Sequence, residues 1–381
     1  MEIVIKTKKG IYLRRHPKFG TLVFSPFSGL FLAVADNLSD DVEKYCNNKA
    51  HNLPEKIINH LNIGDEKCIY DSFDVENWLP SKDHFSDIDE LPDGQPIVLN
   101  WLISNKCNCD CTYCYAGDVI DKEFAEVDVI EIAKELLDMN PLAIVLSGGE
   151  PLLEKSKLKD ILNTIGNKTG IMLDTNGLIY QQDLIPLLKK YNVVVRVSLD
   201  SLLNSANSKI RPQKDKKSNE FSVQTIVKNI QLYRSAGIPV LVHTVLSTMN
   251  KKHIEDLSKQ LPMLKVNGWR IFTIVRPNDD AKKDSFEKLM KYGKVKTIEE
   301  AEKKIYKEMV YFERKFRSES HFHVQILKGS TTKHNSVILV MPDGELMTEG
   351  MFKSAKTTVD KNCLFKKVDL RSHYERYLGL I

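Results

Sequence analysis

Asn105-Lys-Cys-Asn-Cys-Asp-Cys-Thr-Tyr-Cys-Tyr115 contains four of the seven cysteines of this 381-residue chain. Three of them, Cys107, Cys111 and Cys114, have the spacing C-x3-C-x2-C. An iron–sulfur cubane normally takes one thiolate for each of its irons. Three thiolates from one short loop therefore leave one iron open, and an open coordination position is what a catalytic metal needs. The spacing predicts a catalytic iron–sulfur cluster in this loop.

Two other uses of these cysteines stay open from the residues alone. A zinc knuckle would need a fourth ligand, which Cys109 could supply, but Cys109 sits between two candidate ligands in a tight loop. The nearest histidine downstream of the loop, His243, is far away in the sequence. A disulfide pair is disfavoured because the chain shows no secretory signal. If the other three thiols hold a cluster, we expect Cys109 to point away and to be inert.

The motifs that follow the cysteine loop resemble those of the radical SAM superfamily. Tyr113 precedes the last cysteine, where that superfamily usually has an aromatic residue. Ser147-Gly-Gly-Glu-Pro151 resembles its GGE motif, and Asp174-Thr-Asn-Gly177 and Val197-Ser-Leu-Asp-Ser201 follow in the expected order. The resemblance covers about residues 96–275.

The resemblance implies two cofactors, one [4Fe–4S] cluster on Cys107, Cys111 and Cys114 and S-adenosylmethionine on the open iron. In that superfamily the cluster passes one electron to the sulfonium and breaks its C–S bond to give a carbon radical, so an external one-electron donor is also implied. The protein supplies position and a dry site for this chemistry. The resemblance places contacts to the cofactor at Tyr113, Gly148, Gly149, Glu150, Asn176, Ser198, Asp200 and Arg211.

The residue types alone also suggest roles for several of these positions. Gly148 and Gly149 permit close approach of the backbone to a ligand and positive φ angles. Glu150 is an acceptor suited to an ammonium group. Asn176 belongs to an Asn-Gly pair, which is first of all a turn signal. Arg211 precedes a proline where relatives have glycine, and its alternative is an ordinary surface position.

The predicted strand at 193–199 carries polar residues on one side. Alternation places Arg196, Ser198 and Asp200 on the same face. Polar groups on a central strand are costly in an apolar core, so a ligand is the natural explanation. The alternative for Arg196 is an ion pair that faces a helix. On the predicted strand at 239–246, His243 and Thr244 could lie inside a barrel, although a lone strand histidine is more often a core residue.

Six strand-length apolar runs alternate with helical patterns in the middle of the chain. The strands are predicted at 96–104, 142–146, 170–173, 193–199, 239–246 and 269–275. The helices are predicted at 127–139, 155–165, 182–190, 221–236 and 253–261. Alternation of this kind favours an α/β fold with a parallel sheet. Six such units resemble the partial, open barrel of the radical SAM enzymes, so residues 96–275 are predicted to form a partial (β/α)6 TIM-like barrel with its chemistry at the carboxyl ends of the strands. Trp269 to Phe272 are expected to make apolar contacts to the adenine of the cofactor or to form the far wall.

Both flanks of the barrel are predicted to be separate units. Residues 1–80 read as a small α+β domain and residues 81–95 as an acidic linker. The N-terminal pattern is similar to the peptide-recognition domains of radical SAM maturases of ribosomal peptides, in which a leader peptide adds to a sheet edge; its alternative is a structural cap. Residues 276–381 read as a C-terminal α+β extension with a helix and a β-hairpin. Cys363 is the only cysteine after Cys114, so a second cluster is not expected.

Composition narrows the function classes. Hydrophobic residues make up 42% and charged residues 28%, as in ordinary globular proteins. The net charge of +4 gives no reason to expect a nucleic-acid partner. No apolar run reaches 18 residues, so no membrane-spanning helix is predicted. Clustered free cysteines without an export signal predict a cytoplasmic protein.

Three functions compete on this basis. The first is a radical SAM enzyme that abstracts hydrogen from a peptide or protein, giving a crosslink, an epimer or a related product. The second is radical modification of a nucleotide or small metabolite, as in viperin-like enzymes. The third is a non-catalytic binding or regulatory protein with a degenerate barrel. The intact Cys107, Cys111, Cys114 and Glu150 argue against the third.

Overall fold

The computed structural model describes residues 3–61, 95–117, 119–215, 217, 220, 222–274, 282–319, 324–327, 336–348, 368 and 370–377. Nearly all of the predicted linker at 81–95, and Cys363, lie outside the described residues. The boundaries predicted for the flanking units therefore stay predictions.

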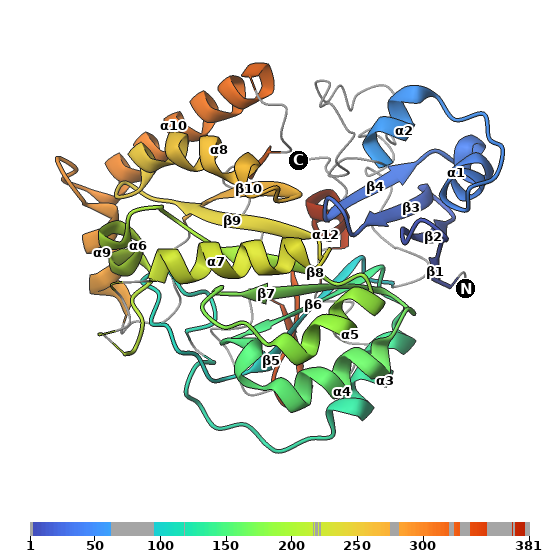
Figure 1. Ribbon diagram of the computed structural model, residues 1–381, viewed down its shortest axis with the longest axis horizontal. Coiled ribbons are helices and arrows are strands. Elements are labelled where there is room, and N and C mark those ends of the chain that lie inside the picture. Colours follow the sequence, from blue (N-terminus) through green and yellow to red (C-terminus); the bar gives the residue numbers. More distant parts are fainter. Residues whose placement is uncertain are drawn as a thin grey trace.

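A nine-stranded sheet in the order β11-β10-β9-β8-β7-β6-β5-β12-β13 forms the centre of the molecule (Figure 1). The six predicted barrel strands are six consecutive members of this sheet and pair in parallel throughout. The prediction of an α/β, partial TIM-like barrel is confirmed. Their bounds are β5 Val98–Ser104, β6 Ala143–Gly148, β7 Gly170–Thr175, β8 Val194–Ser198, β9 Val240–Leu246 and β10 Gly268–Thr273.

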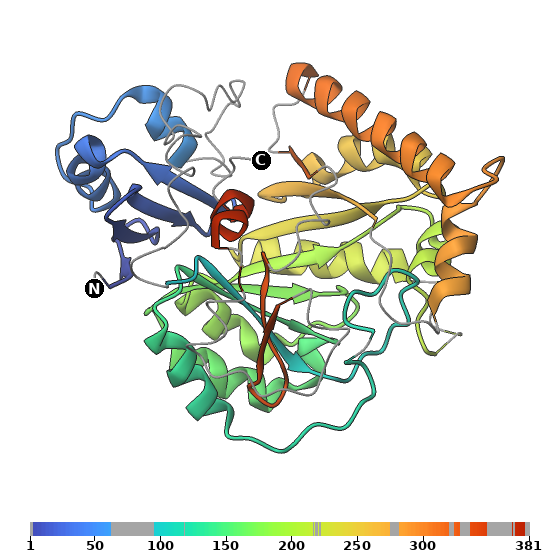
Figure 2. The same ribbon diagram turned by 180° about the vertical axis from the view of Figure 1, so that it is seen from behind.

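The C-terminal strands extend the barrel sheet at both edges. β11 (Val324–Leu327) lies parallel to β10, and β12 (Ile338–Val340) lies parallel to β5. β13 (Leu346–Thr348) then pairs antiparallel with β12. The predicted hairpin is present, but it continues the barrel sheet (Figure 2).

Helices cover the outer face of this sheet because most of them present an apolar stripe to it. The outward side chains of the barrel strands, such as Trp101, Leu146, Val195 and Trp269, pack with these stripes in one large core. Asp128 begins one helix by accepting a hydrogen bond from the backbone N–H of Ile130. The helices are α3 Val129–Asp138, α4 Lys155–Ile165, α5 Ile185–Lys190, α6 Asn204–Ile210, α7 Ser222–Ser235, α8 Ile254–Met263, α9 Lys283–Met290 and α10 Ile298–Glu319.

The N-terminal residues form a second, antiparallel sheet in the order β1-β2-β3-β4. Both faces of this sheet are covered. Helices α1 (Ser39–Cys46) and α2 (Glu55–Leu61) pack on one face. The other face packs against the underside of the barrel, where the barrel strands begin. The strands are β1 Ile5–Lys6, β2 Tyr12–His16, β3 Gly20–Ser25 and β4 Leu30–Val34.

The contact between sheet and underside is close and apolar. Phe24 of β3 lies so near Gly170 that a Cβ on this glycine would be 2.2 Å from the Phe24 ring. Gly29, in the turn before β4, reaches Leu241 and accepts a hydrogen bond from the guanidinium of Arg270 inside the barrel. The N-terminal sheet therefore closes the barrel from below.

Helix α12 (Leu370–Tyr377) completes this closure. Nε2 of His373 accepts a hydrogen bond from the backbone N–H of Ile97 (2.9 Å), and the hydroxyl of Tyr374 donates to the carbonyl of Gln95 (3.0 Å). The ring of Tyr377 packs edge-on against Phe31 of β4. The same helix thus ties the start of β5 to the N-terminal sheet.

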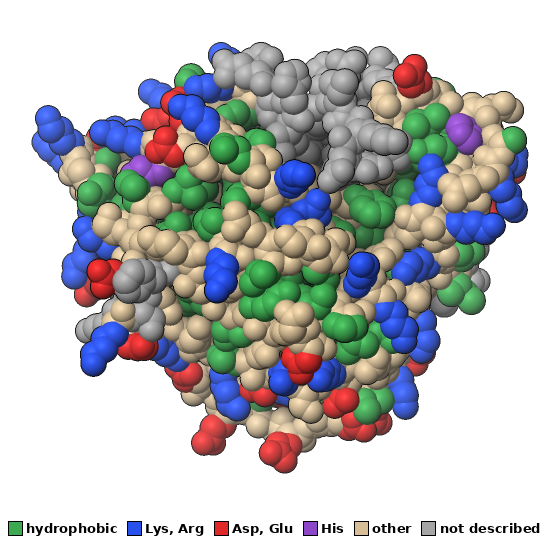
Figure 3. All heavy atoms as spheres, in the orientation of Figure 1, with side chains coloured by type: hydrophobic (Ala, Val, Ile, Leu, Met, Phe, Trp, Pro, Cys, Tyr) green, Lys and Arg blue, Asp and Glu red, His purple; other side chains and the backbone are tan. Residues whose placement is uncertain are grey.

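The described helices and the charges on one face of the molecule bear on possible partners. No helix in the described part of the chain is both long and apolar enough to cross a bilayer. On the face drawn in Figure 3, basic side chains are interspersed with acidic ones over the barrel helices. A protein that follows a phosphate backbone gathers its basic residues on one face.

Candidate active site

The cysteine loop, residues Asn105–Tyr115, lies at the carboxyl end of β5 and is held against the segment that follows α6. The backbone N–H of Asp110 donates to the carbonyl of Pro212 (2.7 Å), and that of Thr112 to Ile210 (3.0 Å). Cys109 forms an isolated antiparallel bridge with Gln213. These bonds give the loop a fixed backbone partner, which its short sequence alone could not provide.

The four thiols of the loop lie close together. Cys107, Cys111 and Cys114 are partly exposed, whereas Cys109 is only 4% exposed. A hydrogen bond from the Cys109 thiol lowers the pKa of Cys107, and the same interaction lowers the pKa of Cys111 to about 6. Burial raises the pKa of Cys114 to about 12. The expectation that Cys109 points away is wrong, because its thiol hydrogen-bonds with those of Cys107 and Cys111.

The donor set fits an iron–sulfur cluster in its chemistry. No group of three or more His, Cys, Asp or Glu side chains within the described ranges is arranged as a finished metal site. The thiols must therefore reorient to bind iron, which three partly exposed side chains on one loop can do. Arg211 and Lys282 lie close enough to balance thiolate charge, since the positive charge of each lowers the pKa of Cys111.

Lys282 is a residue of this site that the sequence did not indicate. Its ammonium group donates to the carbonyl of Cys111 (3.0 Å) and pairs with Asp110. It stands at the start of α9, in a lysine-rich stretch with no motif to separate it from its neighbours. Only the path of the chain reveals its place beside the cysteine loop.

Gly148 and Gly149 are required by the backbone of the cysteine loop. The N–H of Gly149 donates to the carbonyl of Ser104 (2.6 Å), and that of Glu150 to Lys106 (2.7 Å). A Cβ on Gly149 would lie 2.0 Å from the Lys106 carbonyl oxygen, and Gly148 has φ +117. The two glycines therefore allow two backbone segments to cross, whatever ligand they also approach.

Glu150 is fully buried beneath this crossing. Its carboxylate accepts hydrogen bonds from the Thr175 hydroxyl (2.9 Å) and from the backbone N–H groups of Asn176 (2.7 Å) and Leu152 (3.1 Å). Burial raises its pKa to about 7 despite these donors. The Asn176 amide also donates to Asn108 (2.6 Å), so the loop after β7 is tied to the cysteine loop.

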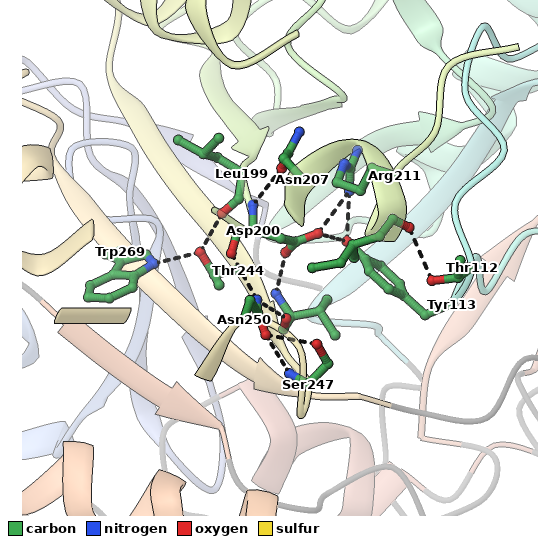
Figure 4. Close-up of polar contacts among 12 residues, drawn as sticks. Thr112, Tyr113, Leu199, Asp200, Asn207, Arg211, Thr244, Ser247, Asn250 and Trp269 are labelled. Carbon is green, nitrogen blue, oxygen red and sulfur yellow. Dashed lines mark hydrogen bonds and ion pairs between the residues drawn. The ribbon is translucent and has the colours of Figure 1, made fainter. Parts of the chain in front are cut away.

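Tyr113, Asp200 and Arg211 form one buried network at the end of β8 (Figure 4). The Tyr113 hydroxyl donates to the Asp200 carboxylate and accepts from the Arg211 guanidinium (2.8 Å), which lies 3.9 Å from Asp200. The backbone N–H of Val245 donates to the other Asp200 oxygen (2.7 Å). Arg211 is 8% exposed and is thus not the surface residue of the alternative reading.

Asn250 supports this network from the loop after β9. Its amide donates to the carbonyls of Asp200 (2.8 Å) and Val245 (2.9 Å), and its oxygen accepts from Ser247. Nothing in the sequence around Asn250 marks it as a site residue, because its role is to join the ends of β8 and β9 through their backbone carbonyls.

Two predictions about the barrel wall are corrected. Thr244 and Trp269 face the outer, helix-covered side, where the indole N–H of Trp269 donates to the Thr244 hydroxyl (2.9 Å). Strand alternation explains this, since His243 and Arg270 take the inner positions of β9 and β10. Arg196 also faces inward and bonds Asp174 through two nitrogens, so it is not a helix-facing ion pair. Ser198 is half-buried and lies beside His243.

Comparison with known proteins identifies the barrel. Residues 101–261 match the family model of the Radical SAM superfamily. The chain is 29% identical over 200 residues to an S-adenosylmethionine-dependent nucleotide dehydratase of Psychrobacter lutiphocae, covering 48% of this chain and 66% of that protein. It is 27% identical over 168 residues to the sporulation killing factor maturation protein SkfB of Bacillus subtilis, covering 43% and 39%. The matches thus span less than two thirds of these relatives.

The fold likeness to solved structures extends further along the chain. Streptococcus suis SuiB bound to S-adenosylmethionine superposes with a TM-score of 0.58 at 12% identity, covering 99% of this chain and 88% of SuiB. SuiB bound to its precursor peptide SuiA gives 0.56 at 14% identity, covering 99% and 89%.

Proposed function

We propose that this chain is a radical SAM enzyme, because residues 101–261 match the model of that superfamily, and that it modifies a peptide that docks on the N-terminal sheet. The cofactors of that superfamily are a [4Fe–4S] cluster and S-adenosylmethionine. When bound and reduced by an external one-electron donor, they supply a 5′-deoxyadenosyl radical that takes a hydrogen atom from the substrate. The proposed outcome is a crosslink, an epimer or a related change.

In this proposal Cys107, Cys111 and Cys114 would hold the cluster and would leave one of its irons free for the second cofactor. Glu150 has three of its roughly four acceptor positions filled by the protein, so it can take one further donor, such as the amino group of the cofactor. Asp200 has both oxygens engaged. By the same count two of its acceptor positions are open. In this proposal it positions Tyr113 and Arg211 beside the cysteine loop and can also accept a hydrogen bond from the cofactor.

The observation that carries the peptide substrate is the separate N-terminal sheet. Among the described strands β4 ends this sheet, and it is longer than β1 at the opposite end. An end strand offers unpaired backbone groups to which an extended peptide can add. The fold likeness to SuiB runs over this sheet as well as the barrel, and SuiB has been solved with its precursor peptide.

One observation favours a nucleotide as the second candidate. The relative from Psychrobacter lutiphocae, which matches 200 residues of this chain, is an S-adenosylmethionine-dependent nucleotide dehydratase. That match covers 48% of this chain. A nucleotide substrate would also leave the N-terminal sheet without a role in binding.

The test uses the full chain with its cluster reconstituted without oxygen. Short peptides encoded beside the gene are added with a reductant, and a scrambled peptide serves as the control. We expect release of 5′-deoxyadenosine, a mass change in the peptide, and slower hydrogen–deuterium exchange at residues 30–34 when the peptide binds. Conversion of a nucleoside triphosphate, with no effect of any peptide, would replace this proposal by the second candidate.

A further inference from the structure

Three polar residues form one row across neighbouring strands inside the barrel. His243 of β9 is the register partner of Arg270 of β10, which in turn is the partner of Gln325 of β11. The residues beside them, such as Val242, Trp269 and Ile326, pack in the outer core. Alternation therefore places all three side chains on the inner face of the sheet. Ser198, the partner of His243 on β8, continues the row toward the site.

Each member of the row has a buried polar atom without a partner among the described residues. These atoms are Nε2 of His243, Nε of Arg270 and Oε1 of Gln325. A buried polar group normally finds a hydrogen-bond partner, because a buried donor or acceptor without one has lost its water and gained nothing in return. Three such atoms in adjacent positions of one row indicate a place built for a polar ligand.

The charges around the row select the sign and size of that ligand. Arg196, on the neighbouring strand, gives two nitrogens to Asp174, so this pair is internally balanced. Arg270 donates to the neutral carbonyl of Gly29, and no carboxylate in the described part of the chain forms an ion pair with it. His243 is held neutral, since burial and the charges of Arg196 and Arg270 keep its pKa well below the usual range. Within the described residues the inner face thus offers one positive charge, on Arg270, without an ion pair of its own; the nearby carboxylate of Asp174 is bonded to Arg196.

We propose that His243, Arg270 and Gln325 bind a carboxylate of the substrate. Gln325 donates from its amide NH2 after a half-turn of the amide group, because the amide oxygen can only accept. A guanidinium edge and a neutral imidazole match one singly charged, planar acceptor, whereas a triphosphate would need several more cations. The row lies three residues before the end of β9, which is about 10 Å below the rim of the barrel. A side chain or terminus anchored there leaves the rest of the substrate near the cysteine loop. This inference rests on the proposed peptide substrate. It adds that the part of the peptide that enters the barrel carries a carboxylate.

Calorimetric titration of the cluster-loaded full chain tests the site without turnover. The probes are N-acetylglutamate amide, the matched neutral N-acetylglutamine amide, and inorganic triphosphate. We expect the glutamate probe to bind at least 10-fold more tightly than the glutamine probe. Arg270→Gln should remove this preference, Arg270→Lys should restore part of it, and Lys303→Gln, on the exposed face of α10, should leave it unchanged.

Three results overturn the site: equal binding of the two amides, a preference that survives Arg270→Gln, or tighter binding of triphosphate that is lost in Arg270→Gln. If Arg270→Gln does not fold, Arg270→Lys and Gln325→Leu decide in its place, and an unchanged preference in both overturns the site. The outcome is separable from that of the proposed function. If the protein binds the carboxylate through Arg270 but modifies no peptide, only the proposed function is wrong. If it modifies a peptide but does not bind the carboxylate in this way, only the proposed site is wrong.

Discussion

At the scale of one residue, Glu150 shows how burial and hydrogen bonds together set the pKa of a carboxyl group in this site. The carboxylate is completely buried, and three donors from the ends of β6 and β7 surround it. These donors stabilise the ionised form, while loss of water destabilises it by more, so burial raises the pKa from 4.5 to about 7. A group with such a pKa couples the stability of the empty protein to pH.

The sign of this coupling follows from the protons bound. Between pH 4.5 and pH 7 the folded protein keeps a proton on Glu150 that the unfolded chain has released. The free energy of unfolding should therefore fall as pH rises through that interval, by ~3 kcal/mol at ~1.4 kcal/mol for each pH unit. Glu150→Gln cannot ionise and should lose this part of the slope.

Chemical denaturation of the cluster-free protein across pH 4.5–7.5 measures the difference between the parent and Glu150→Gln. Glu299→Gln, at an exposed position on α10, is the control and should run parallel to the parent. Parallel curves for Glu150→Gln as well would show that Glu150 titrates like an exposed carboxyl.

At the scale of elements, the turn between β6 and the next helix is shaped by the cysteine loop. Gly149→Ala would place a methyl group 2.0 Å from the Lys106 carbonyl oxygen, which is backbone and cannot swing aside. We expect the variant to fold but to bind less than a tenth of the parent iron, because the thiols shift with their loop.

Iron analysis after anaerobic reconstitution measures this effect, and circular dichroism reports the fold. Gly293→Ala is the matched control: this glycine has φ +80 but no atom within 4 Å of an added Cβ, so the change should cost only about 1–2 kcal/mol. Full iron content in Gly149→Ala would mean that the crossing can relax.

The six barrel strands could be predicted because each is a run of strand length in which apolar residues predominate. The flanking pairings could not, since nothing in Ile338–Val340 records that it joins β5. Helix α6 was missed because Asn204–Ile210 is almost wholly polar and only Ala206 and Ile210 mark a buried side. For the same reason the sequence located the cysteines and Glu150, which stand in motifs, but not Lys282 or Asn250, which reach the site through the fold.

At the scale of the whole molecule, the N-terminal sheet and the barrel share one hydrophobic core. Phe24, Phe31 and Tyr12 from the sheet pack with Val98 and Met172 at the underside of the barrel. Removing a ring from this shared core should therefore weaken both parts together.

Phe24→Ala tests this. A buried Phe→Ala change costs about 3–5 kcal/mol, and we expect a single unfolding transition at lower denaturant, seen alike by tryptophan fluorescence and circular dichroism. Met263→Ala, at a position 73% exposed, should change little. Two separate transitions, with the barrel transition unmoved, would show that the sheet is only loosely attached.

The closed underside of the barrel sets a minimum length for the proposed peptide substrate. Barrel strands such as β9 run seven residues, so the N-terminal sheet and the cysteine loop are separated by about 20 Å along the barrel axis. A peptide gripped at β4 has to travel around the outside of the barrel, and an extended chain advances at most ~3.6 Å per residue. At least about six residues of tether must then separate the gripped segment from the modified one, and a residue nearer to its own anchor stays out of reach.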